Sequence, residues 1–246
     1  MNHTDENEIK KEFQLERLIF FSDAVFAIII TIMILDVKLP EALIHPTEDE
    51  SKKSLLEILP KVFVYAISFN VIGSFWMRHL RIFSFLKDYN SQLVVLNLIF
   101  LFSVSLFPFA LSFIFTSSYI MQYTWGIYTY VGIVYFAFFT QTLLIHYLIR
   151  NKEILCFKTD EIESALQWKI RRLSYLAIPA YAVIILCANY FYVNKYVVFA
   201  LLILYGLVVR ILKKKWYPDY KNDEITFISF FKKAKLLKQP VKRVHK

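Results

Sequence analysis

The chain has 246 residues, of which 57% are hydrophobic and 18% aromatic, and its formal net charge is +9 at pH 7. Soluble domains contain roughly 45–50% apolar residues, and a soluble fold of this length has too little interior to bury so large an apolar share. The composition therefore excludes a soluble domain and indicates an integral membrane protein. The positive charge flanks long hydrophobic runs, which favours an anionic membrane surface over nucleic acid as its partner.

Candidate membrane spans follow one another along most of the chain. A helix needs about 20 apolar residues to cross the hydrocarbon core of a bilayer. The polar N-terminal segment lacks the basic region and cleavage site of a signal peptide, so we expect the first span to be retained. The sequence predicts an all-α protein with six spans in residues 1–212, at 18–37, 58–80, 93–115, 124–149, 173–192 and 196–212. The last two are tightly joined, so five spans remain an alternative.

The distribution of basic residues predicts the orientation. With both termini in the cytoplasm, the outer segments hold five of the 29 Lys and Arg residues and the inner segments hold the other 24. Short cytoplasmic loops are rich in Lys and Arg. The sequence therefore predicts a multi-pass protein of the cell membrane with cytoplasmic N- and C-termini.

Two segments outside the spans mix apolar and charged residues. Residues 151–167 have the composition of an interfacial helix, which lies flat on the membrane. The basic tail, residues 213–246, places aromatic and aliphatic residues among lysines, which suits a helix on anionic headgroups. A disordered solubilising tail is the alternative interpretation of residues 213–246.

The first span has one apolar stripe. At 100° per residue, Ile28, Ile32 and Leu35 lie on one face of the helix and Thr31 lies at its edge. The stripe continues toward the N-terminus through Arg17, Phe21 and Ala24. Ordinary helix packing is the simplest interpretation of such a stripe on periodicity alone.

Ser22 and Asp23 point away from this stripe and form a polar back. A carboxylate in hydrocarbon requires partners. Side chains able to donate hydrogen bonds occur at a similar depth in the second and third spans, namely Trp76, Arg78, His79 and Asn97. We expect these residues to bind Ser22 and Asp23 and to join three helices, and a purely structural role for the set remains open.

These residues carry a resemblance to a known family. The string RLIFFSDAVFAI at 17–28 resembles the R-x-x-x-F-S-D signature of the transmembrane protein 175 family of lysosomal and prokaryotic potassium channels. LDVKLP at 35–40, WMRHLR at 76–81, Asn97 and Pro108 continue the resemblance over about the first 110 residues. Two positions depart from the family pattern, because Leu80 replaces a second His and Arg78 replaces a small polar residue.

The resemblance implies a potassium-permeable channel of leak type, built as a homotetramer whose first helices line one pore. It implies that Ile28, Ile32 and Leu35 form a hydrophobic constriction and that Thr31 supplies a hydroxyl tied to potassium preference. Potassium filters of backbone carbonyls use a T-V-G-Y-G loop, and the four scattered glycines of this chain form none. No cofactor, resident metal or nucleic acid is expected besides the permeant cation.

Two other classes compete with the channel. A secondary transporter could use Asp23 as a cation or proton site, although transporters often contain repeats and broken helices, and the signature is not repeated here. An intramembrane enzyme would need a catalytic constellation in the spans, and we expect none. The other polar residues of the fourth span, Gln141 and His146, are predicted to hydrogen-bond to neighbouring helices.

Overall fold

A computed structural model describes residues 3–37, 48–116, 120–157, 159–173, 175–176 and 179–184, together with 204, 207–208, 211–212 and 214–217. The long helices are α1 (His3–Ile32), α2 (Glu48–Phe83), α3 (Ser91–Ser105), α4 (Phe107–Thr116) and α5 (Ile120–Arg150). A 3-10 turn, η1 (Met33–Asp36), extends α1. Three one-turn helices follow α5, namely α6 (Lys152–Leu155), α7 (Ile162–Ala165) and α8 (Trp168–Arg171).

Four stretches of the described chain are long and apolar enough to cross a membrane: Lys10–Asp36, Ile58–Phe83, Ser91–Phe115 and Trp125–Arg150. They contain, or nearly coincide with, the first four predicted spans. The fifth and sixth predicted spans lie largely outside the described residues, as does the tail at 213–246. The total of six spans therefore stays a prediction.

The third span consists of two helices instead of one. Asn90 caps the start of α3, where its side chain accepts a hydrogen bond from the Leu93 N–H at 2.9 Å. A turn at Leu106 then separates α3 from α4. Pro108 has no N–H to donate to the preceding turn, and as the second residue of α4 it lies where the N–H of a helix has no partner within the helix.

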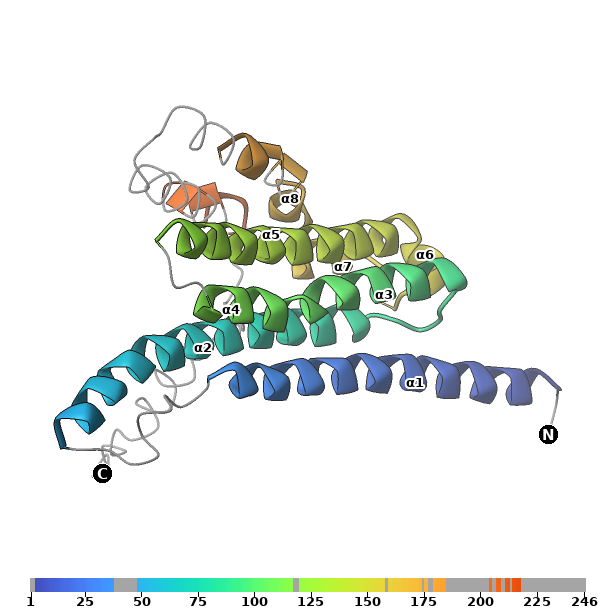
Figure 1. Ribbon diagram of the computed structural model, residues 1–246. Helices are drawn as coiled ribbons and strands as arrows, with labels where there is room; N and C mark the ends of the chain where they lie inside the picture. Colours follow the sequence, from blue (N-terminus) through green and yellow to red (C-terminus); the bar gives the residue numbers. More distant parts are fainter. Residues whose placement is uncertain are drawn as a thin grey trace, which may run out of the picture.

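The long helices form a bundle in which α1 lies at one edge (Figure 1). Both α3 and α4 pack on α5, and α1 packs on α2, α3 and α4. One buried cluster joins these helices around large side chains, with Phe26 from α1, Met33 from η1, Ile72 from α2, Phe100 from α3 and Phe107 from α4. Their burial fixes which face of α1 is turned into its own subunit.

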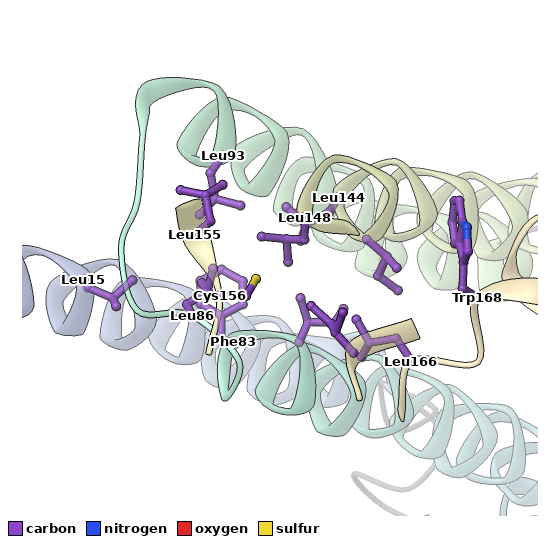
Figure 2. Close-up of a cluster of buried hydrophobic side chains, with 13 residues drawn as sticks. Leu15, Phe83, Leu86, Leu93, Leu144, Leu148, Leu155, Cys156, Leu166 and Trp168 are labelled. Carbon is purple, nitrogen blue, oxygen red and sulfur yellow. The ribbon is translucent and has the colours of Figure 1, made fainter. Parts of the chain in front are cut away.

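A second cluster lies at the end of the bundle where α1 begins (Figure 2). We call residues 84–90 and 151–171 the collar, because they fold across this end. Backbone hydrogen bonds tie its two parts together, from Lys87 N to Leu155 O at 2.9 Å and from Phe157 N to Phe85 O at 2.8 Å. Leu15 of α1 belongs to the same cluster, so the collar contacts the first helix.

The structure of the collar differs from the interfacial helix predicted for residues 151–167. Residues 151–167 do not form a single interfacial helix, because α6 and α7 are separate turns, with a bridge at Cys156, a bend at Phe157 and a turn at 159–161 between them. Leu155, Ile162 and Leu166 are buried in the bundle instead of facing a membrane surface. Burial also raises the pKa of the Cys156 thiol to about 11, against a lowering effect of the Lys87 ammonium.

Candidate functional site

Helix α1 has two faces of different character. Ser22, Phe26, Ile29 and Met33 recur at intervals of three or four residues and are all buried. This spacing places them in one row along the helix, and the row packs against the rest of the subunit. We call it the packed face of α1.

The opposite face carries the stripe predicted from the sequence. Ile28, Ile32 and Leu35 are 55%, 45% and 70% exposed in the single subunit. Thr31 is exposed beside them, and its hydroxyl lies 2.9 Å from the carbonyl oxygens of both Ala27 and Ile28 in its own helix. We call this the front face of α1. Its apolar side chains are about half exposed or more in the part of the subunit that the structure describes, so they are available to lipid or to another chain.

The front face continues toward the start of α1. Phe21 is 50% exposed, and Ala24 and Arg17 are exposed as well. A uniform apolar face would suit lipid along its whole length. Here the face is apolar between Phe21 and Leu35 and becomes basic at Arg17.

A buried chain of hydrogen bonds joins the packed face of α1 to the next two spans. The Asn97 Nδ2 of α3 donates to Ser22 Oγ at 2.9 Å, and Asn97 Oδ1 lies 2.8 Å from His79 Nε2 of α2. Because the Asn97 amide nitrogen donates to Ser22, the Asn97 amide oxygen is the acceptor toward His79. The His79 Nε2 therefore carries the N–H that donates to Asn97 Oδ1. Ser22 Oγ donates in turn to Leu18 O at 2.9 Å. Three spans therefore meet at Asn97, which is fully buried.

Aromatic rings hold the His79 imidazole in this position. It stacks on Phe83 with ring centroids 4.1 Å apart, and it lies nearly parallel to Phe100 at 5.6 Å. Both rings come from spans that the polar chain already joins. The imidazole orientation is therefore fixed by packing as well as by hydrogen bonding.

Asp23 forms a separate contact near the surface of the subunit. Trp76 Nε1 donates to Asp23 Oδ1 at 2.8 Å, and Trp76 is 37% exposed. Asp23 thus joins α1 to α2 beside the buried chain. Of the two residues that depart from the family pattern, Leu80 is 36% exposed, and the Arg78 guanidinium carbon lies 6.0 Å from the Phe138 ring centroid.

Further polar contacts lie deeper in the bundle, and the sequence interpretation did not single them out. Tyr130 Oη donates to Ser68 Oγ at 2.9 Å, and Ser103 Oγ lies 2.9 Å from Thr140 Oγ1. A hydroxyl residue in an otherwise apolar span is a weak signal for such pairs, because Ser and Thr also bond to their own helix.

The two polar residues predicted on the fourth span contact other segments. Gln141 Nε2 donates to Phe75 O of α2 at 3.2 Å, and His146 Nδ1 lies 2.8 Å from the Tyr175 hydroxyl. Both contacts agree with the expectation that these side chains hydrogen-bond beyond their own helix.

Four membrane-spanning stretches, joined by buried polar contacts and carrying an unpacked apolar face on the first helix, define a multi-pass integral membrane protein. Residues 17–108 match the family described as endosomal/lysosomal potassium channel TMEM175. A potassium channel of Chryseobacterium sp. (strain P1-3) is 32% identical over 209 residues, which cover 84% of this chain and 98% of the relative. The chain belongs to the TMEM175 family of ion channels.

Other relatives match over shorter stretches. The endosomal/lysosomal proton channel TMEM175 of Homo sapiens is 31% identical over 97 residues, which cover 39% of this chain and 19% of that protein. The crystal structure of a lysosomal potassium-selective channel TMEM175 homolog from Chamaesiphon minutus resembles this fold with a TM-score of 0.57 at 24% identity. That likeness covers 69% of this chain and 87% of the solved one, and it supports the shared fold.

Proposed function

We propose that the protein is a potassium-permeable channel of leak type, with Ile28, Ile32 and Leu35 of several subunits forming its narrowest part. The observation that carries this proposal is the exposure of these side chains on the front face of α1, opposite the row that packs into the subunit. Potassium is the proposed permeant ion because relatives from Chryseobacterium and Chamaesiphon are named potassium channels.

One helix cannot enclose a pore, so the proposal requires copies of α1 around a common axis. We infer a homotetramer, in which each front-face residue occurs four times in a ring. Apolar rings can gate a pore by dewetting. Such a constriction selects weakly, since it offers no carbonyl ligands to replace the hydration shell of the ion. The Thr31 hydroxyl, at the edge of the front face, is the proposed contributor to potassium preference.

The buried chain Ser22–Asn97–His79 is proposed to hold α1 against α2 and α3. Lipid offers no hydrophobic drive for association between helices, so close packing and interhelical hydrogen bonds stabilise the bundle. A rigid attachment matters for a pore lined by α1, because a rotation of about 100° would replace Ile28 by a neighbouring residue. Asp23 and Trp76 are proposed to add a second attachment point nearer the surface.

We further propose that the protein lies in a prokaryotic cell membrane with both termini in the cytoplasm. The excess of basic residues on the proposed inner side supports this orientation. The Lys10 end of α1 and the collar would then face the cytoplasm.

The test is a flux assay on the purified protein in liposomes with a potassium gradient. A channel should give potassium flux that rises with the gradient without saturating and needs no exchanged ion. Sodium flux should be smaller but measurable. Saturating, obligatorily exchanged flux would favour the alternative of a transporter with Asp23 at its site, and an absence of cation flux would refute the channel.

A further inference from the structure

We propose that Lys10 and Arg17 form basic rings at the cytoplasmic mouth of the pore and restrict the flow of cations out of the cell. The inference rests on the proposed function, because it needs both the assembly around α1 and the cytoplasmic N-terminus. It adds a determinant of conductance that lies outside the apolar constriction. The argument depends on which face of α1 carries each charge.

Helix α1 is continuous from His3 to Ile32, so the direction of each side chain follows from the helical repeat. Lys10 precedes Ile28 by about five full turns and points in the same direction. Arg17 lies within roughly 20° of that direction. Both side chains are exposed, as are Phe21 and Ile28 further along the same face. The face that would line the constriction therefore continues into two basic positions.

The packed face gives an independent check on this direction. Lys11, the next residue after Lys10, turns about 100° toward the collar, and its Nζ lies 3.1 Å from Asp88 Oδ2. Leu15, on the same side, is buried in the collar cluster. Because Lys11 is fixed to its own subunit, Lys10 is turned toward the front face.

Between Lys10 and Leu35 the helical repeat places no acidic residue on the front face, whereas Glu6, one turn before Lys10, occupies a position about 40° from the direction of Ile28. Glu12, Glu16 and Asp23 lie roughly 120–160° away from the direction of Ile28. Between Lys10 and Leu35 the front face holds basic, apolar and amide side chains and the Thr31 hydroxyl, without a carboxylate. In a tetramer, the mouth would carry four copies of each basic residue around the axis.

The expected effect follows from Coulomb's law and screening. At a rise of 1.5 Å per residue, Arg17 lies about 16 Å and Lys10 about 27 Å from Ile28 along the helix. Four charges about 10 Å from the axis lower the local cation concentration roughly two- to sixfold at ~0.01 M salt. At ~1 M salt the Debye length is about 3 Å, and the effect vanishes. Cations leaving the cell would enter through this depleted mouth, so outward current should be smaller than inward current at low salt.

The experiment measures currents in excised inside-out patches from giant bacterial spheroplasts, in symmetrical KCl at 0.01 M and 1 M. Lys10→Gln and Lys10→Glu should raise the ratio of outward to inward current at 0.01 M, the second variant more, by about two- to fivefold in total. At 1 M both should match wild type. Arg17→Gln should act in the same direction, but it alters the family signature, so the Lys10 variants carry the test.

Lys11→Gln and Lys11→Glu are the matched controls, because they make the same charge changes one residue away on the packed face. They should leave the current ratio unchanged. Wild-type ratios in the Lys10 variants at 0.01 M, or equal shifts in the Lys11 variants, would overturn the inference while leaving a conducting channel. An absence of wild-type current would instead refute the proposed function, and the inference with it.

Discussion

Replacing Asn97 tests whether the buried polar chain holds α1 in place. Asn97→Ala removes both the donor to Ser22 Oγ and the acceptor of His79 Nε2. Ser22 keeps its bond to Leu18 O at 2.9 Å, so its loss is small. His79 is 1% exposed, and its Nε2–H would be left without this partner. The damage therefore falls mainly on the imidazole.

The expected loss of unfolding free energy follows from these two effects, the unpaired His79 N–H and the lost hydrogen bonds. A buried donor without a partner costs about 1–3 kcal/mol, and a lost hydrogen bond between neutral groups about 0.5–1.5 kcal/mol. Interhelical hydrogen bonds in membranes average nearer 0.6 kcal/mol, so the lower part of each range applies. We expect Asn97→Ala to lower the free energy of unfolding by about 1.5–3 kcal/mol.

The assay is SDS-induced unfolding in mixed micelles, followed by tryptophan fluorescence. Asn70→Ala is a matched control, because Asn70 is exposed and, among the described residues, its side chain bonds within α2, to Ala66 O at 2.8 Å. It should change the unfolding free energy by less than about 0.5 kcal/mol. A cycle with His79→Leu should show coupling, because the double variant removes both partners and leaves no orphan. Wild-type stability of Asn97→Ala, or strictly additive effects, would refute the reasoning.

Three other changes test separate contacts. Gly126→Ala should lower the free energy of unfolding by about 1–3 kcal/mol, because a Cβ there would lie 3.2 Å from the Ile114 backbone. A Cβ at Gly73 meets nothing within 4 Å, so Gly73→Ala should be neutral or stabilising, and equal unfolding curves for the two variants would contradict this. Cys156 should resist maleimide at pH 7–8 in the folded protein and react after unfolding, since burial raises its pKa to about 11. Rapid labelling of Cys156 itself in the folded protein, located by peptide mapping, would disprove its burial. Asp23→Ala should weaken assembly more than Asp23→Asn, because Asn keeps an acceptor for the indole N–H; identical melting temperatures would show that this bond adds no stability.

The sequence predicted the first four spans well, because their apolar length is a local property. The first predicted span, 18–37, lies within Lys10–Asp36 apart from its last residue, and 124–149 corresponds to Trp125–Arg150. Periodicity also separated the front face of α1 from Ser22. The division of the third span at Leu106 was not predicted, although Pro108, which lacks a backbone N–H, lies within the predicted span 93–115 and gave a reason to expect a break there.

The collar shows what local patterns leave undetermined. Leu155 and Phe157 are close in sequence and similar in hydropathy, yet Leu155 is 1% exposed and Phe157 is 59% exposed. The difference arises because Leu155 packs into the buried cluster with residues far away along the chain, such as Leu86 and Leu93, and Phe157 is not part of that cluster. Likewise, the sequence proposed Asn97 and His79 as partners of both Ser22 and Asp23. Only side-chain geometry separates the Ser22–Asn97–His79 chain from the Asp23–Trp76 pair.

The unit conductance of Ile28→Asn channels tests the central claim, that the front face of α1 lines the narrow part of the pore. The measurement is single-channel recording of purified protein in planar bilayers with potassium on one side and sodium on the other. Val95→Asn is the matched control, because Val95 on α3 is 52% exposed in a single subunit, close to the 55% of Ile28. An amide in the constriction should hydrate it, so Ile28→Asn should raise unit conductance and weaken the preference for potassium, while Val95→Asn keeps wild-type values. Wild-type conductance and selectivity in assembled Ile28→Asn channels would contradict the account.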